Sequence, residues 1–221
     1  MRVFITGATG FIGSRVTDLL LEGGHDVFAL VRSQRSADAA KRKGVEVVGG
    51  SLEDLSVISD QAAVADATIH TAFNVDHTLS NWEEAHALDT EQLVTKGAEH
   101  GIRTCVLRLP LHVYDQDGSG FTKVMEKKAL ESGHAVYFGQ GQNEASNVHV
   151  DDAAQLFICA LKHAKPGSLY NGASGVASGR EIAEAIANKH GLPASDLSFR
   201  QQKLTRRKDT CPDISLSLQS D

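Results

Sequence analysis

The chain has 221 residues and a formal net charge of −6 at pH 7. This length is enough for one domain with a sizeable buried core, with or without a small additional lobe. The acidic balance argues against nucleic acid as a partner. No apolar run is long enough to span a bilayer, and the first residues already read as a strand, which leaves no room for a signal peptide. We therefore expect a soluble, cytoplasmic protein without a membrane partner.

The cysteine pattern points in the same direction. Cys105, Cys159 and Cys211 lie far apart and match no zinc or redox spacing. We expect free thiols in a reducing compartment, two of them in the core.

The first fourteen residues carry the strongest signal. Arg2 to Thr6 is a short apolar run that predicts a buried parallel strand, and Phe11 to Glu22 predicts an amphipathic helix. Gly7, Gly10 and Gly13 lie between them at a spacing of three. A strand that turns through glycines into a helix directs backbone N–H groups and the positive end of the helix dipole at one point, which suits a pyrophosphate.

The alternative is a purely structural strand–helix turn, but the strand and the helix that the phosphate motif requires are both present. The pyrophosphate is expected over residues 7–12. The cofactor-binding residues predicted in this turn are Gly7, Thr9, Gly10, Phe11, Ile12 and Gly13.

The stretch Ile-Thr-Gly-Ala-Thr-Gly-Phe-Ile-Gly, residues 5–13, resembles the short-chain dehydrogenase/reductase superfamily. Within it, the sequence is similar to the extended or atypical branch that includes the NAD-dependent epimerase/dehydratase family. The resemblance implies an α/β fold, a Rossmann-like doubly wound parallel sheet with a small C-terminal α/β lobe. It also implies an oxidoreductase that uses NAD or NADP on a small carbonyl or alcohol substrate.

The second expected strand, Val27 to Val31, ends at Arg32. In such folds an acidic residue here binds the free ribose 2′-hydroxyl, whereas an arginine accommodates a 2′-phosphate. No Asp or Glu occurs in residues 27–37, while Arg32 and Arg35 both do, although loop arginines can also be simply solvated. The position favours NADP over NAD, with Arg32 as the binding residue.

A helix over residues 36–43, a strand over 45–48, a helix over 55–64 and a strand over 67–72 are expected next. By the resemblance, Ser51 and Leu52 border the adenine, and Thr71, Ala72 and Phe73 border the nicotinamide ribose. His70 alternates away from that end and is expected to be a packed core histidine.

The family pattern breaks after this strand. Residues 74–89 are short and polar, and an expected helix over 90–100 leads directly into a strand over 103–109, so one strand with its helix is missing. That missing part would carry the family's catalytic Ser or Thr and its Tyr-x-x-x-Lys. The strand over 103–109 could then occupy the vacated place in the sheet, and the sequence leaves open whether the shortened sheet folds stably.

No catalytic residue is assigned. The residues four places after the three tyrosines are Gly118, Gly141 and Ser174, and none is a lysine. A lysine one turn away would lower the high phenol pKa of about 10. By the resemblance Pro110 borders the nicotinamide, while Tyr114 and His112 are more simply explained as pocket wall than as catalysts.

The rest of the chain reads as a small substrate-facing lobe with helices over 121–132, 153–164 and 178–190 and strands over 135–139 and 169–172. His149, Asp151 and Asp152 suggest metal ligands, but an Asp as N-cap of the following helix explains them better, and no metal is predicted. The predicted organisation is a dinucleotide-binding domain over 1–115, a lobe over 116–199 and a polar tail over 200–221.

Two functions follow. The first is an oxidoreductase that moves hydride between NADP(H) and a carbonyl or alcohol. The second is a shortened, non-catalytic dinucleotide-binding protein. The sequence leaves the substrate and the oligomeric state open.

Overall fold

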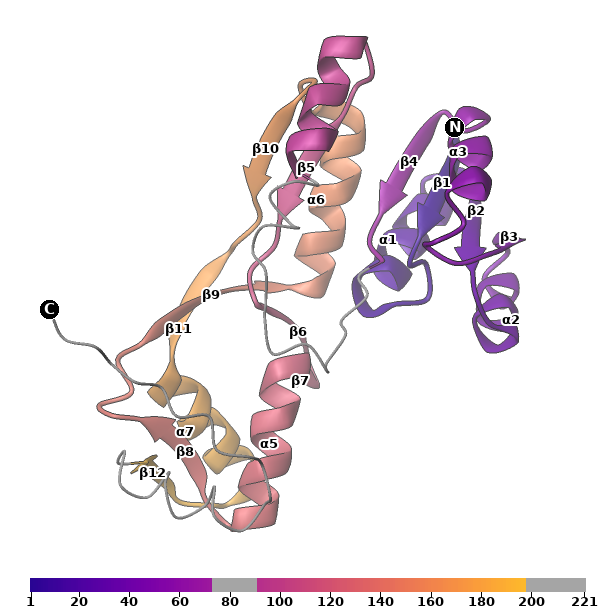
Figure 1. Cartoon of the computed structure of the whole chain (residues 1–221). Helices are drawn as coiled ribbons and strands as arrows, with labels where there is room; N and C mark the ends of the chain where they lie inside the picture. The colour runs from indigo at the N-terminus through magenta and orange to yellow at the C-terminus, as the bar shows by residue number, and fades with distance from the viewer. Residues whose placement is uncertain (73–90, 198–221) are drawn as a thin grey trace, which may run out of the picture. The chain divides into compact units, whose positions relative to one another are not determined.

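The computed structural model describes residues 1–72 and 91–197 (Figure 1). Phe73, the polar stretch to residue 89 and the tail from residue 198 lie outside the described residues. The chain forms two compact units. The first comprises the described residues within 1–116 together with 147–174, and the second comprises residues 117–146 and 175–197. Residues 147–174, which the sequence places in the small lobe, therefore fold with the glycine turn.

The first unit contains a four-stranded parallel sheet with strand order β3-β2-β1-β4, which confirms the α/β prediction. The strands are β1 (Arg2–Thr6), β2 (Asp26–Val31), β3 (Glu46–Gly49) and β4 (Ala67–His70). The connecting helices are α1 (Phe11–Glu22), α2 (Gln34–Arg42) and α3 (Leu55–Ala63). Each lies within a few residues of its predicted position.

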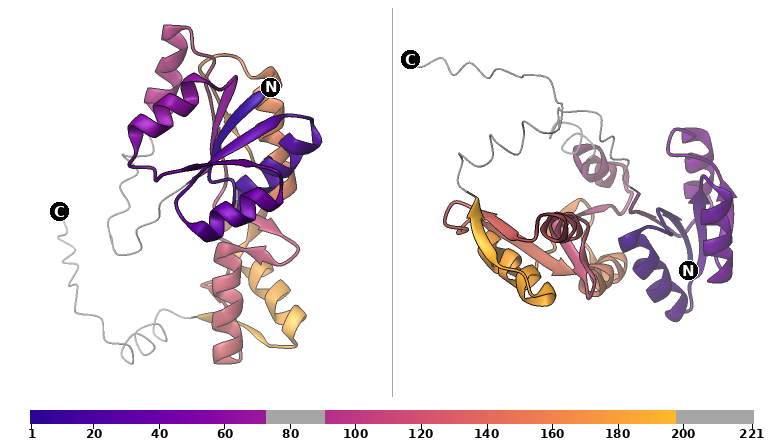
Figure 2. Two further views of the ribbon diagram at one scale, coloured as in Figure 1. Left: turned by 90° about the vertical axis from the view of Figure 1, so that its right-hand side faces the viewer. Right: turned by 90° about the horizontal axis from the view of Figure 1, so that it is seen from below.

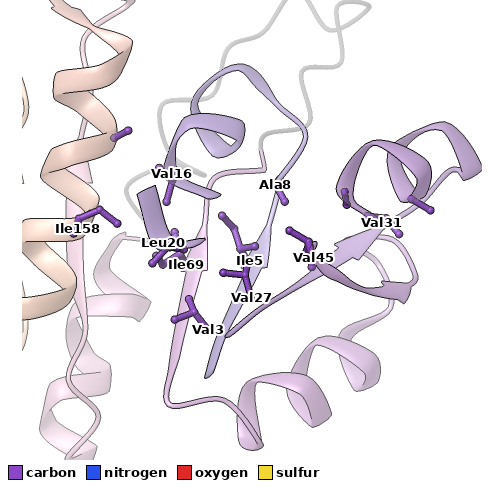
Figure 3. Close-up of a cluster of buried hydrophobic side chains, with 14 residues drawn as sticks. Val3, Ile5, Ala8, Val16, Leu20, Val27, Val31, Val45, Ile69 and Ile158 are labelled. Carbon is purple, nitrogen blue, oxygen red and sulfur yellow. The ribbon is translucent and has the colours of Figure 1, made fainter. Parts of the chain in front are cut away.

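Strand β1 is buried on both faces because its side chains alternate between two clusters. Val3 and Ile5 join the larger cluster, with Val16 and Leu20 of α1 (Figure 3). Phe4 belongs to a second cluster, with residues of β2 and α3. Helices α1 and α3 therefore cover opposite faces of the sheet (Figure 2).

The strand β5 (Cys105–Arg108) does not take the vacated place beside β4, so that prediction is wrong. β5 pairs in parallel with β10 (Ser168–Asn171), while β4 pairs with β1. Within residues 1–72 and 91–197, no strand bridges β4 and β5. The pairing of β5 with β10 runs over four residue pairs, from Ser168↔Cys105 to Asn171↔Arg108. A short helix over residues 91–96 and the 3₁₀ turn η1 (Gly97–His100) precede β5.

Helix α6 (Val150–His163) joins these strands to the core of the first unit. Its Ala154 and Ile158 belong to the same buried cluster as Val16 and Leu20 of α1, and Ile158 points toward Leu20 (Figure 3). The helix follows β9 (Glu144–His149), whose end pairs with β6 (His112–Asp115), a strand that the sequence did not predict.

The second unit has its own small core. It contains β7 (Gly118–Ser119), α5 (Gly120–Ser132), β8 (Ala135–Phe138), β11 (Gly175–Ser178), α7 (Gly179–His190) and β12 (Ala194–Leu197). β8 and β12 pair in parallel, and α5 and α7 bury alanines and Ile186 against them. Ser178 and Glu181 form a capping box that begins α7.

Three expectations about single residues are wrong. His70 is exposed rather than packed in the core, since β4 pairs only with β1 among the described strands, and its ring is only partly removed from solvent. Cys105 is half-buried and Cys159 exposed, so neither is a core thiol, although both are free. Cys211 lies outside the described residues.

Within the described residues, no helix combines the length and apolar character that crossing a membrane requires.

Candidate dinucleotide-binding site

The glycine turn has the geometry of a phosphate-binding corner. Gly7 has φ of +82°, a left-handed conformation that favours glycine, and it turns the chain out of β1. The backbone N–H of Gly10 donates to the carbonyl of Gly7 at 2.9 Å, which closes the turn. Helix α1 begins at the next residue.

Gly7 and Gly13 are required by close packing inside the protein. A Cβ on Gly7 would lie 2.7 Å from the backbone nitrogen of Ala72 and 2.8 Å from Oγ1 of Thr71. A Cβ on Gly13 would collide with the carbonyl of Gly7 and with Thr71. The Thr71 hydroxyl donates to the carbonyl of Thr6 at 2.9 Å, which fixes Thr71 against the turn.

Gly10 differs from the other two glycines. A Cβ there would meet a single described atom, the carbonyl of Gly7 at 3.2 Å, and its φ of −76° is open to any residue. Packing alone therefore does not require glycine at this position. Gly10 is the N-cap of α1, and it is exposed together with Thr9 and Phe11. The first turn of α1 contains no acidic residue, and Gly10 has no side chain to obstruct the approach to it. Both features suit a phosphate group.

Arg32 lies where a ribose phosphate is expected. It is exposed and directly follows β2, whose Leu30 pairs with Thr6 at the end of β1, so it lies close to the glycine turn. Ser33 is the N-cap of α2 and accepts a hydrogen bond from the backbone N–H of Ser36 at 3.2 Å. The positive end of α2 thus adds to the charge of Arg32, and no acidic residue lies in its first turn.

Ser51 and Leu52 have partners within the protein. The backbone N–H of Ser51 donates to Asp54 at 2.7 Å and its hydroxyl lies 3.0 Å from the same oxygen, which lowers the pKa of the Asp54 carboxyl. Leu52 packs against the cluster of Phe4 and its neighbours. These contacts order the loop after β3, and the adenine contact stays a prediction.

On the nicotinamide side, the structure brings Thr71 and Ala72 together with Gly7 and Gly13. Pro110 is half-buried in the loop after β5. Phe73 lies outside the described residues. The nicotinamide contacts stay predictions.

Two histidines lie near strand ends. The Nδ1 atom of His70 lies 2.6 Å from the hydroxyl of buried Thr6, and partial desolvation lowers the pKa of the imidazole. His112 is buried at the start of β6, and burial lowers its pKa as well. Tyr114, on the same strand, packs edge-on against His149 with 5.4 Å between the ring centroids.

A pocket of about 530 Å³ opens beside the first turn of α1. Its walls come from the glycine turn, α1, the end of β6 and the corner between β9 and α6. It is lined by Thr9, Gly10, Phe11, Ser14, Arg15, Asp115, Gln116, His149, Val150 and Asp151. Three of the predicted cofactor residues are among these, and the sequence did not predict the other seven as site residues.

The start of α6 differs from the prediction. The N-cap is His149 and not an aspartate, because its Nδ1 accepts a hydrogen bond from the backbone N–H of Asp151 at 3.3 Å. Asp151 and Asp152 lie in the first turn, where carboxylates interact favourably with the helix dipole. Asp151 also accepts from the Arg15 guanidinium at 2.5 Å. Within the described residues, no group of three His, Cys, Asp or Glu side chains is placed to hold a metal.

Two family models match overlapping parts of the chain. The NmrA-like family model matches residues 1–107, and the NAD dependent epimerase/dehydratase family model matches residues 86–173. An uncharacterized protein of Schizosaccharomyces pombe is 32% identical over 252 aligned residues, which cover 91% of this chain and 84% of that protein.

Solved structures share the fold. One is a dTDP-glucose 4,6-dehydratase from Bacillus anthracis in complex with NAD, with a TM-score of 0.69, 14% identity and coverage of 90% of this chain and 84% of that one. Another is DesIV, a dTDP-glucose 4,6-dehydratase from Streptomyces venezuelae with NAD bound, with a TM-score of 0.70, 16% identity and coverage of 97% and 93%. At these identities the likeness shows a common Rossmann fold.

Substitution of Gly13 and of Gly10 should affect the stability of the protein differently. Gly13→Ala should destabilise the protein by about 1–3 kcal/mol, because its methyl group overlaps the Gly7 carbonyl. Gly10→Ala should change stability by less than about 1 kcal/mol, because only a 3.2 Å contact must adjust. Chemical denaturation of both variants measures this. Equal losses at the two positions would contradict the assignment of Gly10 to a ligand rather than to packing.

Proposed function

The chain belongs to the NAD-dependent epimerase/dehydratase family of Rossmann-fold proteins, and from this premise we propose that it binds NADP(H) at the glycine turn. The observation that carries the proposal is the exposed position at Gly10, where a Cβ would meet only the Gly7 carbonyl at 3.2 Å but would block the approach to the first turn of α1. The pyrophosphate is assigned to residues 7–12. The 2′-phosphate is assigned to Arg32, and the nicotinamide to the region of Thr71 to Phe73 and Pro110.

The proposed reaction class is hydride transfer between the nicotinamide and a small carbonyl or alcohol substrate. The nicotinamide supplies or accepts the hydride, and the protein must bind it, orient it and provide a proton. The packing of Thr71 against Gly7 and Gly13, with its hydrogen bond to Thr6, orders the turn and supports this assignment.

A specific observation favours a second candidate, a dinucleotide-binding protein with little catalytic activity. No tyrosine of the sequence is followed four residues later by lysine. The alignment with the fission-yeast relative spans 252 positions, more than the 221 residues of this chain, so that protein has segments without a counterpart here. Both facts support the loss of a strand and helix that carry the proton-transfer residues in the resembling family.

The binding proposal is tested by titrating NADPH into the unmodified protein and into Gly10→Val by calorimetry. The unmodified protein should bind, whereas the branched side chain should abolish binding with little loss of fold, because it occupies the space that the phosphate needs. Circular dichroism serves as the control for folding. Normal NADPH binding by a folded Gly10→Val protein would show that the site is elsewhere.

The cofactor preference depends on Arg32. A charge-assisted phosphate contact contributes on the order of 1.5–3 kcal/mol, or roughly ten- to a hundredfold in affinity. NADPH should therefore bind that much more tightly than NADH, and Arg32→Ala should remove most of the difference while leaving NADH affinity unchanged. Arg35→Ala measures what the second arginine of this segment adds to the preference. Equal affinity of the unmodified protein for the two cofactors would overturn this assignment.

Catalysis should be weak even with the cofactor bound. Positioned proton transfer contributes about 10²–10⁴-fold to rate, so we expect carbonyl reduction slower than about 1 per second on simple ketones and aldehydes. NADPH oxidation with a carbonyl panel measures this. A faster turnover would favour the oxidoreductase candidate, and Tyr114 and His112 would then be the first residues to replace.

A further inference from the structure

Arg15 lies in the pocket beside the glycine turn without belonging to the glycine pattern. It follows Phe11 by four residues, so the two side chains lie on the same side of α1. Both line the pocket together with Thr9 and Gly10. A phosphate held at the first turn of α1 is therefore within the electrostatic reach of this guanidinium.

Asp151 fixes the direction of the Arg15 side chain. Nε and Nη2 of the guanidinium both lie 2.5 Å from Oδ1 of Asp151, in the first turn of α6. The two side chains are 50% and 46% exposed, and ion pairs at that exposure contribute little to stability. The main effect of this ion pair is therefore expected to be the orientation of the Arg15 guanidinium and not the stability of the fold.

The charges around the pocket make Arg15 important for an anionic ligand. Asp115, at the end of β6, lines the same pocket as Asp151. Carboxylates at short range repel an incoming pyrophosphate. The Arg15 guanidinium offsets the charge of Asp151, and the positive ends of α1 and α6 add to this effect.

We propose that Arg15 is a phosphate-facing cation of the dinucleotide site and that Asp151 is the positioning residue that holds its guanidinium along the pocket wall. This inference rests on the proposed NADP(H) binding. A guanidinium has five N–H donors, and the pair with Asp151 engages only Nε and Nη2, which leaves donors for phosphate oxygens. Asp151 also restricts the rotamers of Arg15 before the ligand arrives, which reduces the entropy lost on binding.

The test is a double-mutant cycle on NADPH affinity with Arg15→Ala, Asp151→Asn and the double variant, all checked for folding. Arg15→Ala should weaken binding about tenfold or more and reduce its dependence on salt. Asp151→Asn should weaken binding several-fold while Arg15 is present, because the guanidinium is no longer oriented. In the Arg15→Ala background the same substitution should leave affinity unchanged or improve it, because it removes a negative charge.

The opposite effects of Asp151→Asn with and without Arg15 distinguish a positioning role of Asp151 from a structural one. If Asp151 were merely structural, Asp151→Asn would weaken NADPH binding both with Arg15 and in Arg15→Ala. Arg2→Ala is the matched control, because it removes an exposed ion pair, with Glu46, outside the pocket. Unchanged NADPH affinity and salt dependence in folded Arg15→Ala would overturn the inference while leaving the proposed function standing. Tighter binding by Asp151→Asn alone would overturn the positioning role. Failure of the unmodified protein to bind NADPH would overturn the proposed function and this inference with it.

Discussion

The close approach of α1 to the end of β1 is the constraint on which the rest of the first unit depends. At Gly7 and Gly13 the helix, the turn and the start of the loop after β4 come so near one another that no Cβ fits between them. This approach brings Val16 and Leu20 onto the sheet, where they are fully buried. It also leaves the first turn of α1 at the carboxyl end of the strands. The packing of the core and the position of the proposed phosphate site therefore have the same cause.

Helix α1 also contributes to the joint between the two halves of the first unit. In the described residues β4 and β5 are not hydrogen-bonded to each other, so strand pairing among these residues does not join the halves. Side-chain packing of α6 helps to join the two halves, since its Ala153 and Ala154 are fully buried and Ala154 belongs to the same cluster as Val16 of α1. Small side chains allow two helices to approach closely, which suits a joint made by side-chain packing. Thr68 and His70 are exposed on β4, which has a partner strand on one side only among the described residues. The sequence pattern did not predict this exposure.

The local parts of this structure could be predicted and the non-local parts could not. The glycine spacing and the apolar run before it locate β1, the turn and α1, because each depends on neighbours in sequence. β6 was missed because it has only four residues and pairs with β9, more than thirty residues later. His149 was missed as a cap because an imidazole nitrogen is an unusual acceptor at that position. The pair of Arg15 and Asp151 joins positions 136 residues apart, so no spacing rule connects them.

The same difference between local and non-local structure bears on function. The proposed phosphate binding needs backbone N–H groups from one continuous segment, residues 7–13, which folds correctly as long as α1 and β1 pack together. Proton transfer needs side chains from several segments held at the same point with small tolerance. The proposed loss of a strand and helix from the middle of the sheet would therefore damage the second function before the first. A chain with a closely packed glycine turn but, among its described residues, no strand that joins β4 to β5 is expected to retain the dinucleotide longer than the chemistry. For that reason cofactor binding and turnover must be measured separately in this protein.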